Sequence, residues 1–478
     1  MSGGAIAAPP TATDPPPAAG SDAAGLIRRH GIWAAVGRAV NAAAVFGGTV
    51  LLARLLSQAD FARFNVFRTV LAVAGIAAGS GLGVAALRRV GEALERGDGA
   101  AARRAAGAGP RLGGPLLLFG SALAAGVTWW MGERWFGAEA GWPVAAAAAV
   151  GTLALGGMQI ASETLRGCGG AAAANLLGGV RGAPLVNALL LLAAGGLWLA
   201  GSLTLTSAVW AYAVVAAAVF PVAVWLAVRA VGGIGGQRSE VIGRSELSEA
   251  WAVAWPTTLA TLLSFASVQF DQLVAPTALP AAESDAYVAA RRVVLLAMFP
   301  LSVLNSTAAG LVSRLYGSNR AALGNALRAG ATLVAAPCVL FYAVALVAPE
   351  WTCRLVLGAG YESSAGPLRW LVPGHLVLTL TGSCGLVLTL TGHQRSYLLV
   401  NAAALVLLLT AGPWACRWGG VGLAAAVSGV VGLQNAACWL LARRNAGLDT
   451  AARLTLLVRP RDLRGSLRPR PQRDGGED

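Results

Sequence analysis

The sequence predicts an all-α polytopic membrane protein with about twelve transmembrane helices in two pseudo-symmetric six-helix lobes. Three observations support this prediction: the composition, the number of long apolar runs and an internal repeat. The chain has 478 residues, of which 56% are hydrophobic and 12% are charged, and its mean hydropathy is +0.64. A soluble domain carries roughly 25% charged residues, so a water-facing fold of this size would lack the polar side chains to cover its surface. The same figures exclude intrinsic disorder, and the absence of regular strand alternation argues against an outer-membrane barrel.

Twelve apolar runs are long enough to cross a bilayer, which needs about 20 residues per helix. They lie near 31–54, 60–87, 112–131, 143–165, 176–200, 205–228, 249–275, 284–312, 327–348, 367–391, 396–415 and 420–442. The expected organisation is a disordered N-terminal tail at 1–29, an N-lobe at 30–228, a cytoplasmic linker at 229–248, a C-lobe at 249–442 and a basic cytoplasmic tail at 443–478.

The arginines indicate how these helices are oriented. Each of the 36 cationic residues is an arginine, and cytoplasmic loops of membrane proteins collect such residues. With both termini in the cytoplasm, the inner connections and tails hold 24 arginines, against five at the outer connections. The outer five are Arg54, Arg63, Arg134, Arg354 and Arg417. The sequence therefore predicts a multi-pass protein of the cytoplasmic (inner) membrane, and its charge of +14 reflects topology rather than a nucleic-acid surface.

An internal repeat supports the two lobes. Leu185–Ala188 recurs as Leu399–Ala402 in the corresponding span of the second half. Asp60, Phe64 and Arg68 are echoed by Asp285, Tyr287 and Arg291. In each set the aromatic residue and the arginine are four apart, so they share one helix face. Two lobes of the same orientation, related by an axis along the membrane normal, are expected to enclose a central cavity.

Ionisable residues within the spans are the candidate functional residues. The predicted substrate-binding cations are Arg38, Arg68, Arg181, Arg291 and Arg292, and the acids are Glu163 and Asp271. A cation at mid-bilayer costs on the order of 2.5–3.5 kcal/mol, so such residues normally face a water-filled interior. The arginines outnumber the acids by three, which favours an anionic passenger. The planar guanidinium suits phosphate because it forms bidentate hydrogen bonds without losing its proton.

Each of these residues also has a structural alternative. Arg291 and Arg292 are adjacent and therefore about 100° apart on a helix, so only one of them is expected to face the cavity, and the repeat favours Arg291. Arg292 could equally reach the membrane interface or cap a carbonyl, and Arg38 and Arg181 could also reach the interface. Glu163 is expected to pair with Arg166, at helical spacing.

Asp271 is predicted to act in coupling or gating, because a desolvated carboxylate can carry a proton or bind Na⁺. The alternative is a simple ion pair with Arg291. No cofactor, metal site or catalytic residue is predicted. The six cysteines and three histidines show no ligand spacing, and no outer loop combines two acids with a basic partner, as an enzyme would need.

Residues 53–64, ARLLSQADFARF, form a stretch between the first two predicted spans. This stretch resembles the one that links the first two helices of Wzx-type polysaccharide flippases, a family of the multidrug/oligosaccharidyl-lipid/polysaccharide exporter superfamily. Phe270–Leu273, followed by Tyr287 and the Arg291–Arg292 pair, is similar to its seventh and eighth helices. Further similar segments are Phe299–Pro300 with Asn305, Arg314–Tyr316, the region 357–368, and Leu390–His393. Ala62 and Gly310 depart from the residues usual in the family, glycine and proline.

The resemblance covers residues 30–442 and implies a V-shaped exporter that translocates polyprenyl-pyrophosphate-linked oligosaccharide for O-antigen, capsule or exopolysaccharide synthesis. It implies that the family's lumenal cations correspond to Arg38, Arg68 and Arg291. Implied partners are the lipid-linked glycan, a coupling H⁺ or Na⁺, the bilayer, and possible contacts with a polysaccharide polymerase and glycosyltransferases.

Four alternatives stay open at this stage. A peptidoglycan-precursor flippase would have two further helices after the twelfth. A cation-coupled drug exporter of the same superfamily would carry acids in its cavity. A membrane-embedded polysaccharide-synthesis enzyme would need catalytic groups at an interface loop. The fourth is a scaffold of a synthesis complex.

Overall fold

The computed structural model describes residues 47–137, 141–179, 183–234, 243–316 and 319–453. In these ranges the chain is built of helices with no strand. Seven helices are long and apolar enough to cross a membrane, and an eighth span is formed if one bent pair is counted as a unit. The predicted all-α polytopic membrane fold is therefore confirmed.

The first half of the chain forms the N-lobe. Its helices are α2 (Gln58–Gly75), α3 (Gly81–Glu95), α4 (Gly99–Phe136), α5 (Trp142–Gly167), α6 (Ala171–Leu177), α7 (Pro184–Leu199) and α8 (Leu205–Gly232). A π-helical turn at Ile76–Ser80 (η1) joins α2 to α3, so the two make one long span. Residues 47–55 are helical as well, and the remainder of the first predicted span lies outside the described ranges.

The second half supplies the C-lobe. Its helices are α9 (Arg244–Gln269), α10 (Asp271–Ala278), α11 (Ala281–Ala297), α12 (Phe299–Leu315), α13 (Arg320–Val347), α14 (Pro349–Val356), α15 (Ala365–Thr381), α16 (Cys384–Leu390), α17 (Gln394–Ala415) and α18 (Gly419–Asn445). Three consecutive pairs, α9 with α10, α11 with α12 and α15 with α16, each occupy one predicted span. The predicted linker 229–248 is described only in part, because α8 extends into it, α9 begins in it, and 235–242 lie outside the described ranges.

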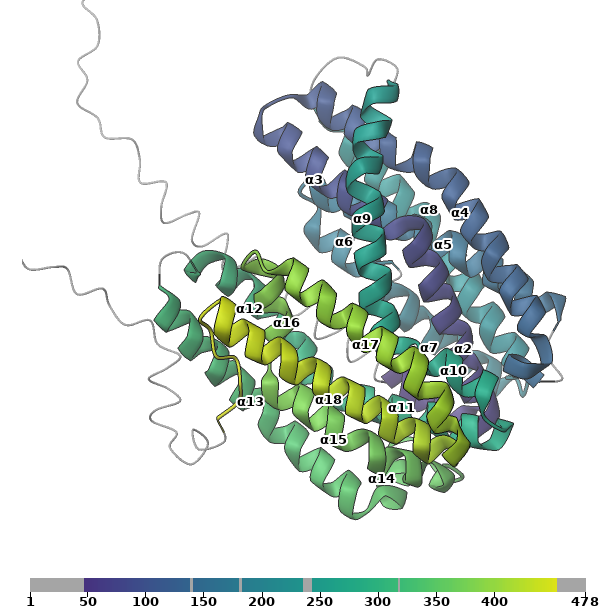
Figure 1. Cartoon of the computed structure of the whole chain (residues 1–478). Helices are drawn as coiled ribbons and strands as arrows, with labels where there is room; N and C mark the ends of the chain where they lie inside the picture. Colours follow the sequence, from purple (N-terminus) through teal and green to yellow (C-terminus); the bar gives the residue numbers. More distant parts are fainter. Residues whose placement is uncertain (1–46, 138–140, 180–182, 235–242, 317–318, 454–478) are drawn as a thin grey trace, which may run out of the picture.

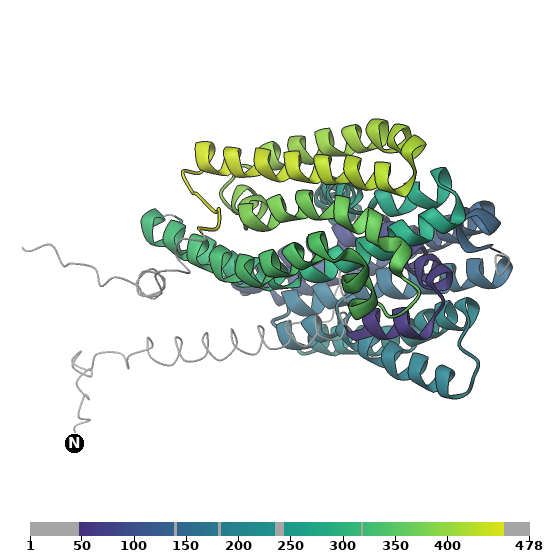
Figure 2. The ribbon, with the colours of Figure 1, turned by 90° about the horizontal axis from the view of Figure 1, so that it is seen from below.

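The two lobes meet at one end and diverge from it. Figure 1 shows α2, α10 and α11 together where the lobes join, with α3 well apart from α12 and α13. Seen from below, the C-lobe helices α13, α15 and α18 and the N-lobe helices lie on opposite sides of the molecule (Figure 2). Helix α9 packs against α3 of the N-lobe and α17 of the C-lobe, so it belongs to both.

Small residues let the helices approach closely. A Cβ at Gly374 of α15 would lie 2.1 Å from the carbonyl oxygen of Ser428 on α18. A Cβ at Gly81 of α3 would lie 2.0 Å from the carbonyl oxygen of Ala254 on α9. Close backbone contact through small residues is the usual way in which membrane helices pack. Alanine and glycine therefore position the helices here, where a soluble protein would use larger core side chains.

The span made by α15 and α16 is broken. It bends by 47° at Gly382, whose φ of +66° favours glycine. The residues after α18, Leu448–Arg453, fold back over this break, and we call them the C-terminal strap. In the strap, Ala452 N–H donates to Leu380 O at 2.8 Å and Thr450 Oγ1 donates to Thr381 O at 2.7 Å. The strap thus satisfies carbonyls that the break leaves without helical partners.

Candidate functional site

Helices α2 and α11 face each other across the lobe interface and carry three of the predicted cations. Ser57 caps α2, because its Oγ accepts a hydrogen bond from the N–H of Asp60 at 3.1 Å. Near the start of α11, Glu283 accepts a hydrogen bond from the N–H of Gly420 at 2.8 Å and so ties the helix to α18. The two helices therefore start from anchored ends and place Arg68 and the Arg291–Arg292 pair deeper in the molecule.

Arg291 is fully engaged within the C-lobe. Its Nε donates to Asp271 Oδ2 at 2.8 Å, its Nη1 lies 2.7 Å from His375 Nε2, and its Nη2 donates to Val268 O at 2.7 Å. Tyr287 donates its hydroxyl to the same Asp271 oxygen at 2.5 Å. Arg291 and Asp271 are 1% and 0% exposed. Their opposite charges therefore pair with each other inside the protein.

The tautomer of His375 follows from its contacts. Its Nδ1 lies 2.8 Å from the Leu371 carbonyl, which can only accept, so Nδ1 carries the proton. Nε2 is then free to accept a hydrogen bond from Arg291. A neutral histidine therefore completes the Arg291 site, and α15 is joined to α11 through it.

Arg291 does not offer the free guanidinium that the repeat favoured. The face of α11 that carries Tyr287 and Arg291 packs into the C-lobe, so the pairing with Asp271 that was the alternative is present. The other two partners were not predicted, because Val268 contributes a backbone carbonyl and His375 is 84 residues away from Arg291. Asp271 Oδ1 is buried and has no hydrogen-bond partner among the described residues.

Arg68 and Arg292 are the two predicted substrate-binding arginines that form no salt bridge in the described ranges. Arg292 is half-buried, and its Nε is buried without a hydrogen-bond partner among the described residues. The guanidinium of Arg68 lies over the ring of Tyr212, 5.4 Å from its centroid. The helices of Arg68 and Arg292, α2 and α11, pack against each other across the lobe interface, and no salt bridge to either arginine is formed among the described residues. Each lobe thus contributes an arginine without a salt bridge to this interface.

The remaining predicted residues fall elsewhere. Arg38 and Arg181 lie outside the described residues. Glu163 pairs with Arg166 at 2.7 Å, as predicted. No cluster of three or more metal-ligating side chains occurs in the described ranges.

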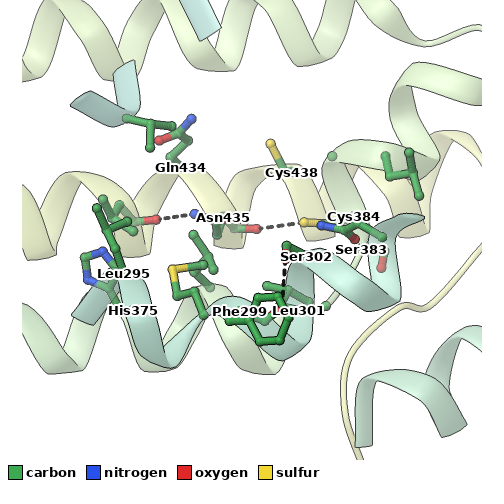
Figure 3. Close-up of a pocket in the computed structure, with 18 of the residues that line it drawn as sticks. Leu295, Phe299, Leu301, Ser302, His375, Ser383, Cys384, Gln434, Asn435 and Cys438 are labelled. Atoms are coloured by element: carbon green, nitrogen blue, oxygen red, sulfur yellow. Dashed lines mark hydrogen bonds between the residues drawn. The ribbon is translucent and has the colours of Figure 1, made fainter. Parts of the chain in front are cut away.

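A cavity of about 470 Å³ lies inside the C-lobe (Figure 3). Arg291 and His375 line it, together with polar groups from α12, α15–α16 and α18 that include Ser302, Ser383 and Gln434. Ser383 is 3% exposed, and its Oγ has no partner among the described residues. The sequence analysis did not identify this cavity, because its polar residues are isolated in apolar helices and meet only in the fold.

The end at which the lobes join is closed by direct contacts between residues 53–61 of the N-lobe and 355–364 of the C-lobe. Tyr361 donates its hydroxyl to Ala53 O at 2.7 Å, and its ring meets Phe61 edge-on with centroids 6.0 Å apart. Arg54 Nη2 donates to Leu355 O at 2.8 Å. Gln58 Nε2 donates to Ser363 Oγ at 3.0 Å. We call these contacts the closed end.

A second charged cavity, also of about 470 Å³, lies between the lobes near the closed end. Its lining includes Arg63 and Arg134, but also Glu133 and Asp285. Arg63 lies 3.5 Å from Asp60. Cations and acids balance here, so this cavity lacks the positive excess found between Arg68 and Arg292.

At the opposite end, ion pairs hold α9 to the N-lobe. Arg89 of α3 contacts Glu249 at 2.5 Å and donates to Glu246 O at 2.7 Å. Arg104 of α4 contacts the Glu246 carboxylate at 2.5 Å. The first turns of α9 therefore move with the N-lobe, although its far end adjoins the C-lobe.

The two-lobed, all-helical arrangement of this chain resembles solved structures that are described as transporters of the MOP superfamily. No family model and no curated protein matches the sequence. Among solved structures, the chain is similar to an inward-facing multidrug resistance MATE family transporter of that superfamily. The TM-score is 0.65 at 15% identity, covering 86% of this chain and 98% of the other.

Two further solved structures share the fold. One is a MOP superfamily transporter from Pyrococcus furiosus, described as having a binding pocket of reverse polarity that suggests a different function. Its TM-score is 0.56 at 16% identity, over 88% of this chain and 95% of the other. The second is an outward-facing MATE family transporter, with a TM-score of 0.54 at 16% identity over 93% of this chain and 96% of the other. At these identities the comparisons establish the shared fold.

Proposed function

We propose that this protein is a flippase that moves polyprenyl-pyrophosphate-linked oligosaccharides across the cytoplasmic (inner) membrane for surface polysaccharide synthesis. The observation that carries the proposal is the unpaired interlobe couple of Arg68 and Arg292. A pyrophosphate is a compact anion that accepts hydrogen bonds from several directions, and guanidinium groups bind it with charge-assisted contacts. The polyprenyl tail would remain in the bilayer while the headgroup occupies the space between the lobes.

The placement of the two arginines on opposite lobes suggests how cargo drives the conformational cycle. Without an anion, their repulsion opposes approach of the lobes. A bound pyrophosphate would replace that repulsion with two attractions and so favour lobe closure around the cargo, because a ligand shifts an equilibrium toward the state it binds better. Closure on one side and opening on the other would then complete alternating access.

We further propose that both termini lie in the cytoplasm and that the closed end faces outward. The excess of arginine in the connections at the opposite end supports this orientation. In this orientation the lobes diverge toward the cytoplasm, where a newly made lipid-linked glycan would enter. A polysaccharide polymerase and glycosyltransferases would be the partners on the synthesis route.

Asp271 is proposed to couple transport to H⁺ or Na⁺, since one carboxylate oxygen lacks a partner among the described residues. The test is transport by Asp271→Asn in proteoliposomes under separate H⁺ and Na⁺ gradients. Loss of stimulation by one gradient would identify the coupling ion. A normal rate under every gradient would remove Asp271 from coupling and leave it as the structural partner of Arg291.

The substrate proposal is tested by binding of undecaprenyl pyrophosphate to the full-length protein in nanodiscs. Arg68→Gln and Arg292→Gln should each weaken the affinity at least tenfold, because a hydrogen bond to a charged group contributes about 1.5–3 kcal/mol and 1.4 kcal/mol is a factor of ten. Arg88→Gln is the matched control, because Arg88 is exposed and pairs only with Glu92 in the described ranges. Equal affinities for all four proteins would refute an arginine-based site.

A cellular measurement separates the flippase from its alternatives. Depletion of the protein should cause lipid-linked oligosaccharide to accumulate on the cytoplasmic leaflet with unchanged glycan structure. An altered glycan structure would indicate an enzyme instead. Extrusion of lipophilic cations that survives Arg68→Gln and fails in Asp271→Asn would indicate a cation-coupled drug exporter.

A further inference from the structure

Cys384 and Cys438 belong to one buried cluster of the C-lobe. All six cysteines lie in the described part of the chain and are free. Cys384 is the first residue of α16, immediately after the bend of the broken span, and Cys438 is on α18. Helix α16 packs against α18, and both cysteines line the same cavity, whereas Cys168, Cys338, Cys353 and Cys416 belong neither to that cluster nor to that cavity.

The pair faces the C-lobe cavity. Both residues line it, and they are 1% and 2% exposed. Figure 3 shows the two sulfur atoms on opposing elements, with Cys384 Sγ donating to Asn435 O at 3.8 Å. Asn435 precedes Cys438 by about one turn of α18, so this contact anchors the first thiol beside the second. A cavity of about 470 Å³ leaves room for a small ligand against both sulfurs.

We infer that Cys384 and Cys438 form a dithiol site that captures thiophilic ligands, namely trivalent arsenicals and two-coordinate soft metal cations. Sulfur ligands select soft acceptors, and two thiols held together bind as a chelate because the second bond forms at a high effective concentration. A compartment that keeps thiols reduced, as the cytoplasm does, would maintain the pair in the binding form. The inference stands on the thiols and the cavity and is independent of the proposed flippase activity.

The reaction with a monosubstituted arsine oxide needs no oxidant. The As–O bond breaks, one As–S bond forms to each cysteine, and both thiol protons leave with the oxygen as one water molecule. Arsenic stays trivalent throughout. A two-coordinate metal ion would instead displace one proton from each thiol.

Occupation of the site should restrain the broken span. Helix α16 is short and is joined to α15 through Gly382, with its positive φ of +66°. A bridge between Cys384 and Cys438 ties α16 to α18 and fixes the angle at that joint. The same bridge fills the end of the cavity opposite Arg291 and His375.

The test uses the purified full-length protein after removal of reductant, with phenylarsine oxide as the probe. Wild type should bind one equivalent that 2,3-dimercaptopropanol releases and a monothiol at equal concentration does not. Cys384→Ser and Cys438→Ser should each lose at least tenfold in affinity. Cys353→Ser and Cys416→Ser, which remove isolated thiols, are matched controls and should bind as wild type does.

If a serine variant fails to fold, two measurements on the wild-type protein test the dithiol site. In alkylation mapping, phenylarsine oxide should protect Cys384 and Cys438 together and leave the other four cysteines unchanged. Hydrogen exchange at residues 384–390 should slow on binding. Protection of neither residue or of only one, or an unchanged affinity in Cys384→Ser and Cys438→Ser, would overturn the dithiol site.

Discussion

The hydroxyl of Tyr361 donates a hydrogen bond at 2.7 Å to the carbonyl of Ala53, 308 residues earlier in the chain. The bond joins the C-lobe to the N-lobe at the closed end and is buried. Since the Ala53 carbonyl has no side-chain chemistry of its own, this contact depends on the position of the backbone. It therefore forms only in the arrangement in which the two lobes touch at this end.

Tyr361→Phe should weaken the closed end and leave the ring contact with Phe61 in place. One hydrogen bond contributes about 0.5–1.5 kcal/mol, so the ratio of closed to open molecules should fall about two- to tenfold. Spin labels on Ser202→Cys and Ala359→Cys are both exposed near that end. Double electron–electron resonance should report a longer distance between the two labels. Tyr397→Phe, whose ring lines the C-lobe cavity, is the control and should leave the distance distribution unchanged.

Asp271→Ala should destabilise the C-lobe strongly. It leaves the Arg291 guanidinium buried without its carboxylate, and removing one partner of a buried pair costs about 3–5 kcal/mol. Reversible unfolding in mixed micelles measures the loss. Asp271→Ala combined with Arg291→Met should recover most of the lost stability, because neither charge of the buried pair remains. If the double variant is as unstable as the single one, the ion pair is not the cause.

Gly374→Ala should destabilise the contact between α15 and α18. The added methyl carbon would meet the Ser428 carbonyl at 2.1 Å, and overpacking typically costs about 1–3 kcal/mol. Gly429→Ala on the same α18 has no heavy atom within 4 Å of the new carbon and is the matched control. A lower unfolding midpoint is expected for Gly374→Ala alone. Equal midpoints for the two variants would contradict the close helix approach.

The C-terminal strap should loosen at low pH. Burial by itself would raise the pKa of Asp449, but hydrogen bonds from Trp439 and Ala451 and the charges of Arg328 and Arg453 hold that pKa below its usual value. Because the folded pKa is the lower one, the strap is fully stabilised above the usual value of about 3.9 and loses that stability as pH falls through the folded pKa. Faster cleavage by an acid-active protease around the strap, only at such pH, is expected.

Asp449→Asn is the control for this titration. It removes the ionisable group but keeps an oxygen that can accept from Trp439. Strap cleavage in this variant should not accelerate below the usual aspartate pKa. Equal acceleration in wild type and Asp449→Asn would place the titrating group elsewhere.

The fold was predicted from the composition and from the length of the apolar runs. Runs of about 20 residues, the length needed to cross a bilayer, correspond to the helices, and the arginine distribution predicted an orientation. Glu163 and Arg166 were paired correctly because they are three residues apart on one helix. Such contacts follow from helical spacing alone.

The site was predicted less well, because its contacts join distant segments. The repeat favoured Arg291 as the residue that faces the cavity, whereas Arg291 is paired with Asp271 and Arg292 Nε has no hydrogen-bond partner among the described residues. His375 is 84 residues from Arg291 and no local pattern indicates their contact. Cys384 and Cys438 have no ligand spacing in sequence, and only the packing of α16 against α18 brings them together.

Helix α9 is fastened at one terminus to Arg89 and Arg104 of the N-lobe and at the other adjoins α10, where Asp271 begins the next helix. Under the proposed rocking of one half of the molecule against the other, the chain between these two attachments would bend or twist. The buried aspartate lies at the C-lobe end of that segment, so a change in its charge and a deformation of α9 would act on neighbouring atoms.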